Sequence, residues 1–171
     1  MEKDIKTRTT VRTFLPKPVP ENIMHEILKA GMSAPSGCGR YPVRYMILKD
    51  KKILEEISSL PGKMAILSST LNILLLADVS TRVSDDWQGL WPLDCSAAME
   101  NILLEAHFNG LGGVWGGIYP NEGCMKAVKK LLHLPDHIIP FAVAMLGYPD
   151  TEIQPRHPCC HEDWLLDERQ F

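Results

Sequence analysis

Residues 94–120 read DCSAAMENILLEAHFNGLGGVWGGIYP, and this stretch joins two contrasting patterns. From 93 to 108, apolar residues recur at helical spacing, with Asp94 as the expected N-cap and Gly110 as the expected stop. The following positions, 110–120, have the pattern of a strand but hold five glycines. Because glycine weakens a strand, this density indicates either a planar ligand against the main chain or a bulged strand after a helix stop.

Helical and strand patterns alternate through the rest of the chain. Helices are predicted at 21–31, 52–60 and 124–134, and strands at 43–50, 71–80 and 141–147. The last of these strands is a near-continuous apolar run suited to the centre of a sheet. The chain is therefore expected to form a layered fold that mixes helices and strands.

The composition is that of one globular domain, expected to span 1–171. The net charge of −3 leaves no broad basic surface, so neither nucleic acid nor an anionic membrane surface is expected as a partner. The opening MEKDIK lacks the apolar core of a signal peptide, and the longest apolar stretch, 138–146, is too short to span a bilayer. The protein is therefore expected to be cytoplasmic.

The sequence shows no side-chain pattern typical of metal binding or of a familiar catalytic group. The five cysteines include no CxxC pair, and Cys159, Cys160 and His161 are adjacent, whereas structural zinc ligands are separated by a few positions. Neither HExxH nor GxSxG occurs. No metal is expected, no catalytic side chain is assigned, and any enzyme chemistry would have to come from a cofactor.

The stretch TRTTVRTF, residues 7–14, places Arg8 and Arg12 four positions apart with Thr9 and Thr10 between them. On a helix the two arginines would share a face and repel each other slightly. A phosphate would reverse that effect, because it accepts bonds from guanidinium and hydroxyl groups alike. The alternative is a solvated helix start whose arginines meet nearby acidic residues.

Two further segments could take part in a site. The loop APSGCG, residues 34–39, is neither GxGxxG nor a phosphate loop, so it indicates either close backbone approach to a flat ligand or a plain turn. The final segment, 149–171, shows no period but carries Trp164 and Phe171 among other apolar residues. Such an arm is expected to pack on something, and a second subunit is the natural candidate.

These segments, in this order, resemble the short-chain members of the FMN-dependent nitroreductase family. The resemblance runs from about Arg8 to Arg156 and rests on RTTVRTFLPKPVPE, SAPSGCGRYP, the 94–120 stretch and LGYPDTEIQPRHP. It implies an α+β, three-layer fold with a mixed central sheet flanked by helices. It also implies an intertwined homodimer with an extended C-terminal arm at 149–171 and with FMN bound at the interface.

The resemblance also implies which positions contact the flavin. The phosphate and the pyrimidine side of FMN would be held by Arg8, Thr9, Thr10, Arg12 and, from the arm, Arg156. The ring would lie along Pro35, Ser36 and Gly37 of the other subunit and near the amides of Gly116 and Gly117. Where the family usually has Asn, Gln and an aromatic residue after the Pro-Ser pair, this sequence has Gly39, Tyr41 and Val43. The usual asparagine bonds the flavin, so Gly39 removes that contact.

The implied activity is that of an FMN-dependent oxidoreductase. NAD(P)H would deliver a hydride to flavin N5 and leave, and a nitroaromatic compound, a quinone or a similar acceptor would then take the electrons in a ping-pong sequence. One alternative is a non-catalytic flavin-binding or sensing protein of the same fold. Another is a structural or interaction module whose site is empty.

Overall fold

The computed structural model describes residues 5–80 and 89–152. Its helices are α1 (Glu21–Met32), α2 (Lys51–Ser58), α3 (Trp91–Phe108) and α4 (Glu122–Leu131), with short 3-10 turns η1 (Ile5–Thr7), η2 (Gly37–Gly39) and η3 (Met64–Leu67). The strands are β1 (Val43–Ile47), β2 (Leu71–Asp78), β3 (Gly112–Gly117) and β4 (Ile138–Gly147). Each helix and strand predicted from the sequence is present, with ends displaced by a few residues. No helix in the described part of the chain is both long and apolar enough to cross a membrane.

The four strands form one sheet in the order β1-β2-β4-β3, so the apolar run of β4 is central, as predicted. All three neighbouring pairs are antiparallel. The expectation of a mixed sheet is therefore wrong for the named strands of the described chain, where the parallel contact is an isolated bridge between Thr10 and Gly113. The register pairs Ile47 with Ile73, so the α2–η3 connection returns the chain to the end of the sheet where β1 finished.

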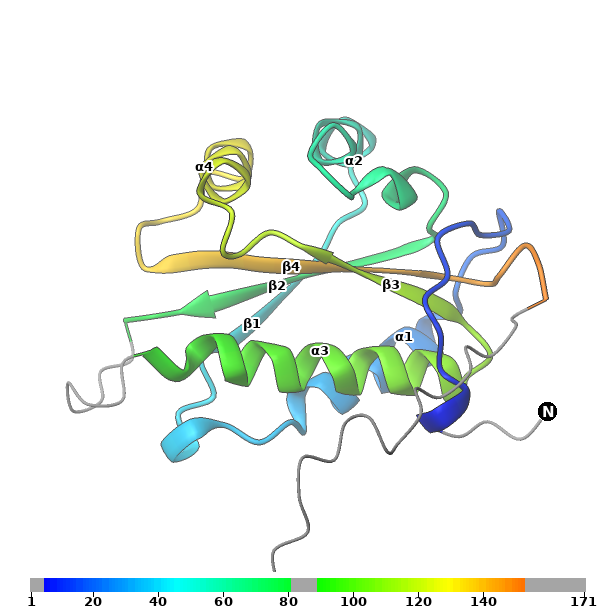
Figure 1. Ribbon diagram of the computed structural model, residues 1–171, viewed down its shortest axis with the longest axis horizontal. Helices are drawn as coiled ribbons and strands as arrows, with labels where there is room; N and C mark the ends of the chain where they lie inside the picture. The colour runs from blue at the N-terminus through cyan, green and yellow to red at the C-terminus, as the bar shows by residue number, and fades with distance from the viewer. Residues whose placement is uncertain (1–4, 81–88, 153–171) are drawn as a thin grey trace, which may run out of the picture.

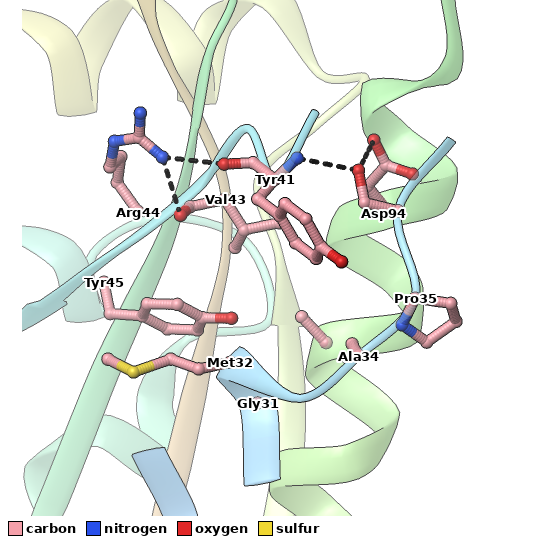
Figure 2. A pocket seen from close by; sticks show the side chains of 11 residues that line it. Gly31, Met32, Ala34, Pro35, Tyr41, Val43, Arg44, Tyr45 and Asp94 are labelled. Carbon is pink, nitrogen blue, oxygen red and sulfur yellow. Dashed lines mark hydrogen bonds between the residues drawn. The ribbon is translucent and has the colours of Figure 1, made fainter. Parts of the chain in front are cut away.

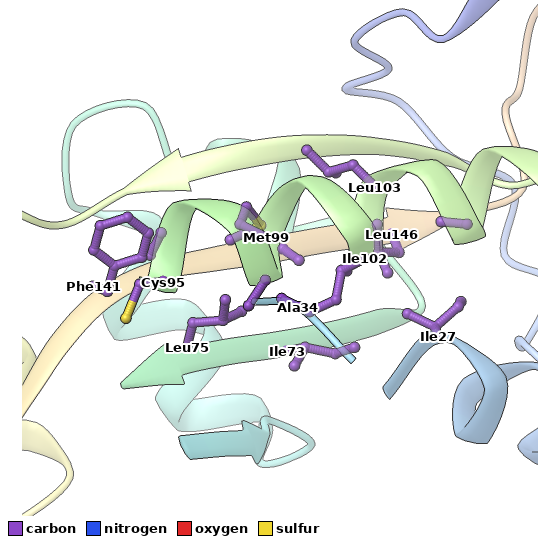
Figure 3. Packing of buried hydrophobic residues seen from close by; sticks show 14 of the residues in the cluster. Ile27, Ala34, Ile73, Leu75, Cys95, Met99, Ile102, Leu103, Phe141 and Leu146 are labelled. Atoms are coloured by element: carbon purple, nitrogen blue, oxygen red, sulfur yellow. The ribbon is translucent and has the colours of Figure 1, made fainter. Parts of the chain in front are cut away.

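Helices cover both faces of the sheet, which confirms the expected three-layer α+β arrangement. In Figure 1, α1 and α3 lie on one face, and α2 and α4 lie on the other. Alternate residues of β2 serve the two faces: Ile73 and Leu75 pack in the cluster with α1 and α3, and Leu74 packs in the cluster with α2 and α4. Figure 3 shows Met99 and Ile102 of α3 in the first of these clusters.

Helix α3 starts earlier than the sequence suggested. It begins at Trp91 with Pro92 in its first turn, where the missing proline N–H costs no intrahelical bond. The expectation that Asp94 is the N-cap is therefore wrong: Leu90 holds that position, and Asp94 lies inside the first turn, where it is buried. Gly110, with a φ of 79°, follows the end of the helix as expected.

The N-terminal segment, defined here as residues 8–14, is extended rather than helical. Thr10 bridges to Gly113, and the Val11 amide donates to the Gly113 carbonyl over 3.0 Å. The predicted helical face shared by Arg8 and Arg12 is therefore wrong, because β-branched residues fill the segment and favour an extended strand-like path. A Cβ on Gly112 would lie 2.6 Å from Val11 Cβ, so glycine there allows the segment to approach β3.

Candidate functional site

The predicted site residues fall into separate regions of the fold. Arg156 lies outside the described residues, as do positions 153–171 of the expected arm, including Cys159, Cys160 and His161. The other predicted positions belong to the N-terminal segment, to the loop between α1 and β1, and to the end of β3. Within 5–80 and 89–152, no group of three or more His, Cys, Asp or Glu side chains is placed to hold a metal ion.

Thr7 and Arg8, at the start of the N-terminal segment, contact the last turn and the middle of α3. The Thr7 hydroxyl lies 2.8 Å from Nε2 of the buried His107, and Arg8 Nε lies 3.5 Å from Glu100 Oε1. The Arg8 and Glu100 side chains are 29% and 47% exposed, so this pair is worth only about 0–1 kcal/mol and can be exchanged for another anion. Arg12 is exposed. The segment therefore presents two guanidinium groups beside the hydroxyls of Thr9 and Thr10.

The N-terminal segment lies beside the outer edge of β3 near Gly113, and the rest of that edge extends beyond it. β3 is an edge strand, and its Gly113 carbonyl points outward to the Val11 amide. Backbone groups alternate in direction along an antiparallel strand, so those of Gly117 also point outward, whereas those of Gly116 point toward Val143 of β4. Gly117 is exposed and Gly116 is buried. Of the two predicted amides, that of Gly117 is therefore the one open to a ligand, about 13 Å along the strand from the Thr10 bridge.

A lysine that the sequence gave no reason to select lies behind Gly116. Lys63 is 3% exposed, its Nζ donates to the Pro61 carbonyl over 2.6 Å, and burial lowers its pKa. A Cβ on Gly116 would lie 3.0 Å from Lys63 Cδ and 2.7 Å from Met145 Cε. The absence of a side chain at Gly116 therefore lets these two side chains reach the strand. A lysine after Pro-Gly is typical of an exposed turn, which is why its burial could not be predicted.

The loop of residues 35–41 is held by α3. The Gly37 amide donates to Asp94 Oδ1 over 2.7 Å, and the Ser36 hydroxyl lies 3.5 Å from Asp94 Oδ2. The Tyr41 amide in turn donates to Ser36 Oγ over 2.8 Å, as Figure 2 shows. Asp94 is only 4% exposed. This buried carboxylate is a second residue whose role the sequence did not reveal, because its position suggested a helix cap.

Positive φ angles shape the tip of this loop. Cys38, Gly39 and Tyr41 have φ values of 55°, 64° and 49°. A Cβ on Gly39 would meet nothing within 4 Å. Glycine is therefore favoured at position 39 by the backbone conformation, which asparagine also tolerates better than most residues.

A cavity of about 440 Å³ lies behind the loop, between the end of α1, β1 and α3. Pro35, Tyr41 and Tyr45 line it, and Figure 2 shows both tyrosines beside the loop. Burial raises the pKa of Tyr45 to about 12, so its hydroxyl keeps its proton at neutral pH. Arg44 also lines the cavity, but its guanidinium bonds to the Tyr41 carbonyl and to Asp78.

The 35–41 loop and Thr7 contact opposite ends of α3, and Arg8 reaches Glu100 in the middle of the helix. Asp94, which holds the loop, is in the first turn of this 18-residue helix, and His107, which holds Thr7, is in the last. A helix of this length spans about 27 Å. Figure 1 shows the corresponding turns, η2 and η1, near the two ends of the helix. One chain thus joins the N-terminal segment to β3, whereas its 35–41 loop precedes β1, which is the opposite edge of the sheet.

Comparison with known proteins places this arrangement in a family. The model of the Nitroreductase family matches residues 5–70 and 73–148. A Methanothermobacter thermautotrophicus protein named for NADH dehydrogenase and NAD(P)H nitroreductase activity is 37% identical over 146 residues, which are 85% of this chain and 75% of that protein. The chain belongs to the Nitroreductase family.

Solved structures share the same fold. A protein from Parabacteroides distasonis with the same name as the Methanothermobacter relative has a TM-score of 0.88 and 32% identity, with 96% of both chains covered. A Desulfovibrio desulfuricans protein described as a nitroreductase in complex with FMN has a TM-score of 0.80, with 97% of this chain and 95% of that chain covered. At 23% identity, the second comparison supports the fold alone.

Proposed function

We propose that this chain binds FMN between two copies of itself and acts as an NAD(P)H-dependent oxidoreductase on nitroaromatic compounds, quinones or similar acceptors. The observation that carries the proposal is the division of the predicted site within one chain. The basic N-terminal segment and the open edge of β3 adjoin, while the 35–41 loop precedes β1 at the opposite edge of the sheet. A complete site would therefore take its loop from a second copy.

The residues present fit an FMN molecule, which carries a phosphate and a flat ring at opposite ends of a flexible chain. Arg8, Arg12 and the threonine hydroxyls between them are suited to the phosphate, since charge-assisted bonds from guanidinium groups are strong. Farther along β3, Gly117 offers an outward amide with no side chain to keep a ring away. We further propose that Arg156 joins the phosphate from the arm.

A second copy is supported by apolar surface on α3. Leu93 is 65% exposed and Phe108 is 42% exposed, at the two ends of the same helix. An interface along α3 would bury both side chains, and contiguous apolar surface of that kind marks subunit interfaces. We propose that the 1–171 domain pairs with a second copy through this region and that residues 149–171 extend over the partner.

Bound FMN would supply hydride transfer, taking a hydride from NAD(P)H and passing the electrons to an acceptor that enters after NAD(P)⁺ leaves. The chain's own part is to position the ring and exclude water. Arg8 and Arg12 would hold the phosphate, and the Gly117 amide would donate to the ring edge. No described side chain is assigned as acid or base, and solvent can supply the proton.

A non-catalytic flavin-binding role is the second candidate, and Gly39 is the observation that favours it. The loop lacks the side chain that would bond the flavin at this position, so the chain could hold FMN without efficient turnover. Both candidates predict a yellow protein, but only the enzyme predicts fast NAD(P)H oxidation.

The visible spectrum of the purified protein tests the proposal. We expect a flavin spectrum that bleaches when NADH or NADPH is added without oxygen and returns when a quinone is added. A flavin-loaded protein that does not bleach would favour the non-catalytic role. A colourless protein that takes up no added FMN would exclude both and leave a structural module.

A further inference from the structure

We infer that Asp94 is a positioning residue: its buried carboxylate holds the 35–41 loop in the conformation that meets the flavin of a second copy. The inference that the loop meets flavin rests on the proposed function. The inference that Asp94 fixes the loop rests on the contacts of this chain alone. The two parts can therefore be tested separately.

The contacts form a short chain of hydrogen bonds from α3 into the loop. Asp94 Oδ1 accepts from the Gly37 amide over 2.7 Å, and Asp94 Oδ2 lies 3.5 Å from the Ser36 hydroxyl. Ser36 Oγ accepts from the Tyr41 amide over 2.8 Å, and the Ser36 carbonyl accepts from the Gly39 amide over 3.1 Å. Asp94 thus contacts Ser36 and Gly37 directly and reaches Tyr41 through Ser36; Figure 2 shows Asp94 and Tyr41 on the two sides of this chain of bonds.

Apolar packing does little to hold this loop. The cavity lies behind Pro35 and Ser36, Cys38 and Tyr41 are exposed, and a Cβ on Gly39 would touch nothing. A loop that has open space behind it and solvent in front can move unless polar contacts hold it. The bonds to Asp94 anchor Ser36 and Gly37 to α3, and Arg44 holds the Tyr41 carbonyl over 2.9 Å at the other end of the loop.

The position of Gly37 shows that close approach to α3 is required. A Cβ on this residue would lie 2.7 Å from Leu90 Cδ1, so only glycine lets the amide come within reach of Asp94 without displacing Leu90. The first turn of α3 also suits a carboxylate, because the free N–H groups of a helix start favour negative charge. The geometry of the helix start therefore favours a carboxylate acceptor at this position.

The first test uses Asp94→Asn and Asp94→Ala in the protein without added FMN. Because a bond to a charged acceptor is lost or weakened, we expect hydrogen exchange of the Gly37, Gly39 and Tyr41 amides to become about tenfold to a hundredfold faster in Asp94→Ala, and less so in Asp94→Asn. Exchange in β4 should stay unchanged. Glu105→Gln, a carboxylate-to-amide change on the same helix away from the loop, is the matched control. Wild-type exchange of the loop in Asp94→Asn and in a folded Asp94→Ala would overturn the inference.

The second test measures FMN affinity in the same variants. We expect Asp94→Ala to bind FMN about tenfold to a hundredfold more weakly than the wild type, Asp94→Asn to lie between them, and Glu105→Gln to bind normally. If the loop loosens while FMN affinity is unchanged, the link to the flavin is wrong. If the wild type takes up no FMN, the proposed function fails, and the exchange data still decide whether Asp94 fixes the loop. Should Asp94→Ala not fold, Asp94→Asn decides both tests.

Discussion

Arg8 Nε lies 3.5 Å from Glu100 Oε1, so a carboxylate of α3 meets the arginine that we propose for the FMN phosphate. A phosphate must compete with this carboxylate or share the arginine with it. We predict that Glu100→Gln raises FMN affinity about two- to fivefold, which is the scale of a partly exposed ion pair. Titration of the apoprotein with FMN at low and high salt measures the effect, which should shrink as salt increases. Weaker binding in Glu100→Gln would mean that Glu100 helps to orient Arg8.

The neighbouring glycines of β3 should respond differently to the same substitution. A Cβ on Gly117 would have only the Tyr119 carbonyl nearby, at 3.9 Å, so Gly117→Ala should fold normally yet bind FMN about tenfold more weakly. A Cβ on Gly116 would crowd Met145 and Lys63, so Gly116→Ala should lower the free energy of unfolding by about 1–3 kcal/mol. Urea unfolding and FMN titration of both variants check this contrast. Normal FMN binding by Gly117→Ala would show that the outer edge of β3 is not part of the FMN site.

Position 39 offers a gain of function. Its φ of 64° and the open space around it should accept asparagine at small cost. We predict that Gly39→Asn strengthens FMN binding about two- to tenfold by adding one hydrogen bond. Gly62→Asn is the matched control, since Gly62 has a φ of 72° and equally open surroundings outside the loop. An equal effect of both substitutions, or none from Gly39→Asn, would refute this account of the loop.

The buried thiol of Cys95 should make the fold sensitive to alkali. Burial raises the pKa of Cys95 from 9.0 to about 12, so above pH 9 the unfolded chain loses this proton while the folded chain keeps it. The free energy of unfolding should therefore fall by up to about 1.4 kcal/mol per pH unit between those values. Urea unfolding at pH 8, 9 and 10 should show a shallower alkaline decline in Cys95→Ala than in the wild type. Equal declines would contradict the burial of an unionised thiol.

Much of the fold could be read from the sequence because its apolar patterns are strong. The run FAVAMLG predicted a central strand, and β4 is central. Whether neighbouring strands run parallel or antiparallel could not be predicted, because an apolar pattern indicates only which residues are buried. The mixed sheet was implied by the family resemblance, whereas the named strands of the described chain pair antiparallel.

The candidate site was predictable as residue types but not as geometry. Arg8 and Arg12 suggested an anion site, yet their segment is extended because it bridges to Gly113, a contact distant in sequence. Asp94 suggested a helix cap, but Pro92 lets the helix start earlier and frees the carboxylate to bind Gly37. The burial of Lys63 could not be predicted from the sequence, because it depends on the space left by the missing side chain of Gly116.

Subunit complementation tests the two-copy site most directly. One chain carries Arg8→Ala with Arg12→Ala, the other carries Ser36→Ala with Asp94→Ala, and each alone should bind FMN at least about tenfold more weakly than the wild type. Differently tagged chains are expressed together, the mixed dimer is purified, and its bound FMN is counted. We predict one site of wild-type affinity per mixed dimer, built from the intact segment of one chain and the intact loop of the other. A mixed dimer that binds as weakly as both parents, or a chain that binds FMN as a monomer, would contradict the account.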